Sequence, residues 1–200
     1  LAEAVCDRLG YNFIAQPIAW DAKDQELASG NIDCIWNGFT ISGRENDYTW
    51  TQAYMENNQV VVVKADSGIT TFADLAGLKV AVQKDSSGLA ALEENEALTS
   101  TFAELIEEES YLNAMMELES GAVDAIVMDE IVARYEIQTS GKDFVVLDET
   151  VASEAYGVGF LLGNEALRDD VEKTLIEMKN DGTLAQISEK WFGADVTTIK

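Results

Sequence analysis

A phrase that occurs twice constrains the fold of this 200-residue chain more than any other feature of its sequence. Residues 26–38 read ELASGNIDCIWNG, and residues 117–129, at an offset of 91 positions, read ELESGAVDAIVMD. Each copy places a helix-favouring run before a glycine, which is the residue most often found just past a helix end, and an apolar run after it. The repeat therefore predicts one helix–turn–strand unit that is used twice.

The rest of the chain alternates between helical and strand patterns in the same way. Apolar spacing predicts helices that end at Gly10 and span 21–29 and 111–120, with two more starting near Ser87 and Asp129. The expected strands cover 11–18, 32–36, 59–64, 79–83 and 123–128. Such alternation predicts an α/β fold with largely parallel sheets. Because the chain has one proline and no Gly/Ser-rich tract, we expect no flexible linker.

Composition excludes several classes of function. A formal net charge of −24 disfavours an extended phosphate-binding surface, so we expect no nucleic-acid partner. The chain has no histidine, which removes histidine-ligated metals and histidine-based nucleophilic catalysis. We expect no metal and no cofactor. The two cysteines, Cys6 and Cys34, fit no paired metal or redox motif, and both a disulfide and two buried thiols remain open.

The repeat also indicates where a ligand would bind. Ligands of open α/β sheets bind outside the carboxyl ends of the strands. The first copy ends its strand at Asn37 and Gly38, and the second copy ends at Asp129. These residues are therefore candidate ligand contacts, placed on two lobes that face each other across a cleft.

Four separated motifs carry a resemblance to a known family. They are WNGFTISGREND, VAVQKDSSG, VDAIVMDE and the stretch from YGVGFLLGN to NDGTLAQISEKWFG. In this order they resemble the bacterial family-3 solute-binding proteins, which are amino-acid-binding components of ABC transporters. The resemblance implies a two-lobed, type II periplasmic-binding-protein-like α/β fold in which each lobe is a sheet flanked by helices. Lobe 1 would comprise 1–58 and 158–200, and lobe 2 would comprise 59–157.

The same resemblance implies a function and partners. The chain would be an extracytoplasmic monomer, in the periplasm or at the cell surface, that encloses a free polar or cationic amino acid between its lobes and presents it to a membrane permease. It would not be an enzyme. The sequence leaves open whether a segment outside this chain carries a lipid anchor. Two alternatives on the same fold are a ligand-sensing receptor domain and a dehydratase-like enzyme that would use Asp129 or Asp85 as its acid.

In lobe 1 the resemblance assigns the ligand's α-carboxylate to Arg44, whose planar guanidinium suits a carboxylate, and to Thr40. The backbone around Gly38 would accept from the ammonium group. Trp20 matches an aromatic residue that stacks on the ligand side chain, and Phe39 lies near it in sequence. Aromatic walls of this kind favour cationic side chains.

In lobe 2 the resemblance assigns Ser86 and Ser87, at the start of a helix, to the same carboxylate. Asp129 would pair with the ammonium group, and Gln83 is a candidate reader of a polar side chain. The family often has glycine where Asp85 stands. The resemblance also leads us to expect a further strand of lobe 1 before Leu1.

Overall fold

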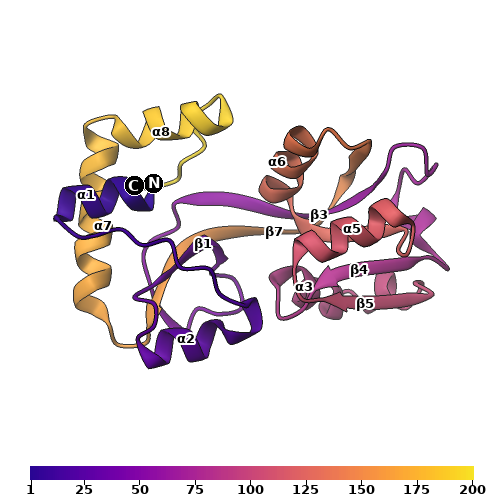
Figure 1. Cartoon of the computed structure of the whole chain (residues 1–200), viewed down its shortest axis with the longest axis horizontal. Helices are drawn as coiled ribbons and strands as arrows, with labels where there is room; N and C mark the ends of the chain where they lie inside the picture. Colours follow the sequence, from indigo (N-terminus) through magenta and orange to yellow (C-terminus); the bar gives the residue numbers. More distant parts are fainter. The chain divides into compact units, whose positions relative to one another are not determined.

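The structure is a computed structural model that describes residues 1–200, and it divides the chain into two compact units. Unit 1 comprises Leu1–Glu56 and Glu154–Lys200, and unit 2 comprises Asn57–Ser153. The divisions fall inside two long strands, β3 (Met55–Lys64) and β7 (Phe144–Leu161), which carry the chain from one unit to the other (Figure 1). The fold is α/β, with sheet and helices in each unit, as the sequence predicts. The expectation of largely parallel sheets is wrong for unit 1, whose strands pair antiparallel, and parallel pairs occur in unit 2.

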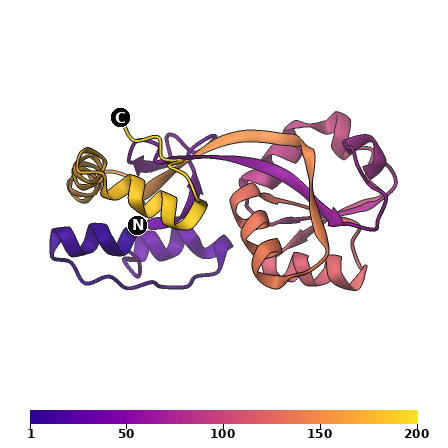
Figure 2. The same ribbon diagram turned by 90° about the horizontal axis from the view of Figure 1, so that it is seen from above.

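Unit 1 is built around the second part of β7, which has a strand on each side. The strand β1 (Ile35–Thr40) and the short strand β2 (Tyr48–Trp50) both pair antiparallel with β7, and Gly159 lies opposite Ile35 in one pair and Trp50 in the other. The helices are α1 (Ala2–Leu9), η1 (Trp20–Ala22), α2 (Lys23–Ser29), α7 (Glu165–Asn180) and α8 (Thr183–Phe192). Both views show α1, α7 and α8 gathered on one side of this unit (Figure 2).

Four aromatic rings form the core beside this sheet. Phe39 is 0% exposed, and its ring centroid lies 5.5 Å from that of Trp20, 4.9 Å from that of Tyr48 and 4.7 Å from that of Trp50. The backbone of β7 approaches this cluster closely at Gly159. A Cβ atom added there would lie 2.7 Å from two carbon atoms of the Phe39 ring. The second glycine of the GVG in the YGVGFLLGN motif is therefore explained by packing.

Substituting Gly159 with alanine should destabilise the protein by about 1–3 kcal/mol, because a methyl group would overpack a filled aromatic core. Urea denaturation followed by tryptophan fluorescence measures this change. The same substitution in a Phe39→Leu background is the control, since the smaller side chain gives the methyl group room. Equal losses in the two backgrounds would contradict the packing explanation.

Unit 2 is a sheet with helices on both faces. Its strands run in the order β3, β6 (Ala125–Asp129), β4 (Lys79–Gln83), β5 (Glu104–Glu108), with β4 parallel to β5 and β6, and β3 antiparallel to β6. Alternate residues of β3 show the two faces: Val60 and Val62 pack with residues of α5 (Tyr111–Ser120) and α6 (Glu130–Ser140). Val61 and Val63 pack with η2 (Phe72–Leu75), α3 (Ser87–Glu94) and α4 (Glu96–Thr99).

The repeated phrase forms the same local structure in both units. Gly30 ends α2 at φ 75° and Gly121 ends α5 at φ 80°, in the left-handed conformation that favours glycine. The amide of each glycine donates to the leucine carbonyl three residues earlier, at 3.2 Å in both copies. The next residue of the chain donates to the carbonyl of Glu26 in one copy, at 3.0 Å, and of Glu117 in the other, at 2.9 Å. The prediction of one helix–turn–strand unit used twice is confirmed.

The predicted bounds of helices and strands agree with the structure for some elements and not for others. β4 and α5 have the predicted bounds, and α1 ends at Gly10 as expected. The predicted strand over 11–18 is wrong: this segment has no strand hydrogen bonds. Its apolar and β-branched residues favour an extended chain, yet a strand also needs a paired neighbour, and β1 pairs with β7 instead.

Candidate functional site

The carboxyl ends of the three parallel strands of unit 2 bring together polar residues that are far apart in the sequence. Ser86 and Ser87 follow β4, Tyr111 follows β5 after two residues, and Asp129 is the last residue of β6. Because β4, β5 and β6 are parallel, these ends lie at one edge of the sheet. Three predicted ligand residues, Ser86, Ser87 and Asp129, therefore lie at the same edge of the unit 2 sheet.

Asp129 is held by side-chain donors from two elements. Its side chain is largely buried, and the residue is 9% exposed. Its Oδ1 accepts hydrogen bonds from Asn57 Nδ2, at 2.9 Å, and from Gln59 Nε2, and its Oδ2 accepts one from the Tyr111 hydroxyl at 3.0 Å. A buried carboxylate needs such donors to offset its loss of water. The result is a carboxylate whose two oxygens are held in place at the sheet edge.

The two serines stand at the start of α3 and have different roles there. Ser86 is the N-cap residue, and its Oγ accepts from the Leu89 amide at 3.1 Å. The Ser87 Oγ accepts from Gln59 Nε2 at 3.1 Å, which ties it to the network around Asp129. Asp85, before them, has φ 55°, in the left-handed region that residues other than glycine rarely adopt.

Gln83 lies apart from this network. It is the last residue of β4, and its Nε2 donates to the backbone carbonyl of Glu109 at 3.3 Å. Its amide therefore links the ends of β4 and β5. The role of Gln83 as a reader of a ligand side chain stays a prediction.

In unit 1 the predicted carboxylate-binding residues stand at the end of β1 and in the turn that follows. Arg44 Nη1 donates to the Thr40 carbonyl at 3.4 Å, and its guanidinium carbon lies 5.4 Å from the centre of the Phe39 ring. The Arg44 carbonyl in turn accepts from Trp50 Nε1 at 3.0 Å. The aromatic core thus contacts both the backbone and the side chain of Arg44. The role of Arg44 in binding a carboxylate stays a prediction.

The aromatic residues near this turn differ in what they can contact. Phe39 is fully buried in the core, so its ring serves packing. Trp20 is half-buried and has the ammonium group of Lys23 5.1 Å from its ring centre.

Gly38 has φ 97°, and a Cβ atom added there would lie 3.1 Å from the Tyr156 ring. Asn37 is exposed. Trp20 and Asn37 are the members of this predicted group that also line a cavity.

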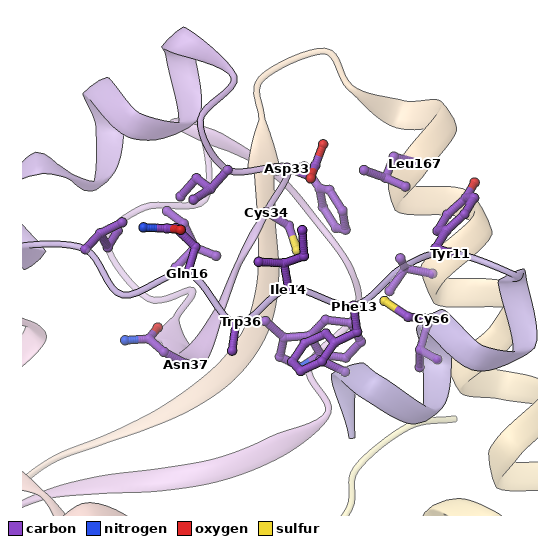
Figure 3. A pocket seen from close by; sticks show the side chains of 18 of the residues that line it. Cys6, Tyr11, Phe13, Ile14, Gln16, Asp33, Cys34, Trp36, Asn37 and Leu167 are labelled. Carbon is purple, nitrogen blue, oxygen red and sulfur yellow. The ribbon is translucent and has the colours of Figure 1, made fainter.

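This cavity is a hollow of about 900 Å³ within unit 1. Its walls come from α1, the extended segment 11–18, β1 and α7, and Figure 3 shows Cys6, Cys34, Ile14 and Trp36 among the side chains that line it. Both cysteines are free thiols. The sequence left open a disulfide or two buried thiols, and the structure has two thiols that are only partly buried. The expectation of a further strand in this lobe stays a prediction.

The two thiols should react slowly with alkylating reagents. Burial has the largest effect on Cys34 and, with the charges of Asp33 and Cys6, raises its pKa to about 12. Burial also has the largest effect on Cys6, and the charges of Asp7 and Asp33 raise its pKa further. Because only the thiolate is nucleophilic, the alkylation rate of Cys34 should still be rising between pH 9 and 11. Iodoacetamide labelling of Cys6→Ser measures Cys34 alone, with guanidinium-unfolded protein as control. A plateau below pH 9 in folded protein would contradict this prediction.

The sequence did not single out three members of the unit 2 site, which are Asn57, Gln59 and Tyr111. The repeat offers a signal for Tyr111, because it stands opposite Trp20 at the head of the second helix. No local pattern marks the other two. They are polar residues at the start of an apolar strand, and their partners are 72 and 70 positions away.

No group of three or more acidic or cysteine side chains is arranged to hold a metal ion, and no helix is long and apolar enough to cross a membrane.

Comparison with known proteins connects this arrangement to one family. The model of the family "bacterial extracellular solute-binding proteins, family 3" matches residues 1–194. The L-cystine-binding protein TcyJ of Escherichia coli is 32% identical over 199 residues, covering 98% of this chain and 73% of that protein. The L-cystine-binding protein TcyA of Bacillus subtilis is 32% identical over 195 residues, covering 96% of this chain and 70% of that protein.

A solved structure agrees with this relationship. A substrate-binding protein of an ABC uptake transporter from Streptococcus pneumoniae, with bound histidine, has a TM-score of 0.93 and 34% identity. The similarity covers 98% of this chain and 82% of that one. The fold, the two units and the ordered motifs therefore have one explanation: the chain belongs to the family-3 bacterial extracellular solute-binding proteins.

Proposed function

We propose that this chain binds a free polar or cationic amino acid as the extracytoplasmic binding component of an ABC transporter. The observation that carries the proposal is the buried Asp129 carboxylate, held by Asn57, Gln59 and Tyr111 at the carboxyl edge of the unit 2 sheet. A carboxylate fixed in this way is suited to an α-ammonium group, which has three donors and no acceptor. Relatives named for cystine and arginine, and a related structure that contains histidine, support the ligand class.

The proposal divides the amino acid's backbone groups among named residues. Asp129 takes the α-ammonium group. Arg44 and Thr40 of unit 1, with Ser86 and Ser87 of unit 2, take the α-carboxylate, because they offer charged and neutral donors. Binding by residues of both units would stabilise the closed state over the open state. A membrane permease would then recognise the closed form, and the binding protein itself would act as a monomer without catalysing a reaction.

A thermal-shift screen tests the proposal, with the purified chain and L-arginine, L-histidine, L-cystine and L-glutamine. An amino acid at 100 times its Kd should stabilise the fold by about 2.7 kcal/mol. Calorimetry then gives the Kd. The controls are the D-enantiomers and 5-guanidinopentanoic acid, which is arginine without its α-ammonium group. If a folded sample binds none of the four, or binds the analogue as tightly as arginine, the proposal is wrong.

A further inference from the structure

Gln59 lies at the junction of the two groups that the proposed function assigns to opposite ends of the amino acid backbone. It is 0% exposed and stands directly opposite Asp129 in the antiparallel pairing of β3 with β6. Its side chain therefore projects on the same face of the sheet as that of Asp129. Its Nε2 donates to Asp129 Oδ1 and to Ser87 Oγ, the latter at 3.1 Å.

The amide nitrogen of Gln59, which carries two hydrogens, thus donates to both residues. The carboxylate of Asp129 fixes the orientation of the amide, because turning it over would place the amide oxygen against a negative charge. The oxygen, Oε1, instead lies beside α3, where a Cβ atom added to Gly88 would be 2.7 Å away. Glycine at position 88 thus leaves room for the amide in this orientation.

The orientation of the amide determines what its neighbours can do. A serine hydroxyl has one hydrogen to donate. Since Ser87 Oγ already accepts from Gln59, its own hydrogen points away from the Gln59 amide. Asp129, which receives a donor from the same amide, is kept as an acceptor. Gln59 therefore gives two adjacent groups opposite hydrogen-bonding polarity, and this matches the ammonium and carboxylate groups of an amino acid.

We propose that Gln59 is a positioning residue for amino-acid binding, which holds Asp129 as an acceptor and turns the Ser87 hydroxyl to donate. This inference rests on the proposed function for its consequence, while the hydrogen-bond geometry can be tested without any amino acid. Asn58, the next residue of β3, provides a matched control. It donates to Glu130 at 2.7 Å and accepts from Ser153 at 2.8 Å, and does not join the Asp129 network.

The first test uses NMR of the chain without amino acid. The two side-chain amide protons of Gln59 give separate resonances because rotation about the amide C–N bond is slow, and each should respond to the loss of its own partner. Asp129→Asn should shift one of them and Ser87→Ala the other, and Asn58→Met should shift neither. If both substitutions move the same proton, or neither proton moves, the inference is wrong whether or not the chain binds amino acids.

The second test measures the Kd of L-arginine, L-histidine, L-cystine and L-glutamine by calorimetry. Gln59→Met should weaken binding by about 10- to 100-fold for an amino acid that the wild-type chain binds, because a hydrogen bond to a charged group is lost. Asn58→Met should leave the Kd within about threefold. Circular dichroism of each variant checks that the fold is intact.

A double-mutant cycle separates positioning from general destabilisation. In an Asp129→Asn background, Gln59→Met should cost much less than it does in the wild-type chain, because the two residues act on the same ligand group. Gln59→Glu gives a second readout: binding should be weakest at pH 7.5 and recover toward pH 5, where the introduced carboxyl regains a hydrogen to donate. Additive losses and a flat pH profile would overturn the inference. Absence of binding by the wild-type chain would instead overturn the proposed function.

Discussion

Replacing Arg44 with alanine should reduce amino-acid affinity by about 100-fold or more, while the fold stays intact. A guanidinium that makes two charged hydrogen bonds to a carboxylate contributes about 3 kcal/mol or more to binding. In the structure its side chain contacts the Thr40 carbonyl and the Phe39 ring, so its removal should cost unit 1 little. Calorimetry gives the Kd, and the thermal midpoint reports on the fold.

Two further arginine variants make this result interpretable. Arg44→Lys should keep the charge but lose the paired donors, and so should restore only part of the affinity. Arg168 is the matched control in unit 1. Its Nη1 donates to the Trp50 carbonyl at 2.8 Å, and it forms an ion pair with Asp169. Arg168→Ala should change stability and leave the Kd unchanged. An Arg44→Ala variant with wild-type affinity would show that another residue binds the α-carboxylate.

Replacing Asp129 with alanine is expected to affect both binding and stability. It removes the partner of the ammonium group, and it leaves the donors of Asn57, Gln59 and Tyr111 facing a space without their acceptor. A buried donor that loses its partner costs about 1–3 kcal/mol, so the free energy of unfolding should fall by several kcal/mol. Urea denaturation measures this loss, and calorimetry should detect no binding.

Asp129→Asn separates the two effects. An amide still accepts hydrogen bonds through its oxygen, so much of the stability should return while affinity remains low because the negative charge is absent. Asp124 is the control just before the other end of β6, where its carboxylate accepts from the Lys79 amide at 2.9 Å. Asp124→Ala should lower stability and leave binding unchanged. Wild-type affinity in Asp129→Asn would rule out a charge-paired ammonium group.

The sequence predicted most where the local chain determines the structure. The glycine-ended helices of the repeat are defined by a few adjacent residues, and the ends of β4 and α5 were predicted to the residue. The segment 11–18 shows the opposite case. Its composition is that of a strand, but pairing depends on a neighbour elsewhere in the chain, and periodicity does not reveal whether that neighbour is present.

The residues of the candidate site also differ in how well the sequence could predict them. Ser86, Ser87 and Asp129 could be found because each stands at the junction of a strand and a helix, which the sequence pattern locates. Asn57 and Gln59 could not, since their importance comes from the register of β3 against β6. Phe39 was expected near the ligand and is a core residue. An apolar residue beside a binding residue in sequence can belong to either environment, and only the packing of β1 on its neighbours decides between them.

The position of β3 has a mechanical consequence. Asn57 is the first residue of unit 2, and it and Gln59 are fixed to Asp129, so the backbone from Asn57 onward cannot bend without losing hydrogen bonds to a buried charge. On the other side, the Tyr54 amide donates to the Tyr156 carbonyl and Met55 forms a bridge with Thr197. Glu56, exposed and between these fixed points, is where a hinge in this strand would have to act. A proline or a glycine introduced at this one position would therefore alter the stiffness of β3, without touching any residue that the proposed function places against the amino acid.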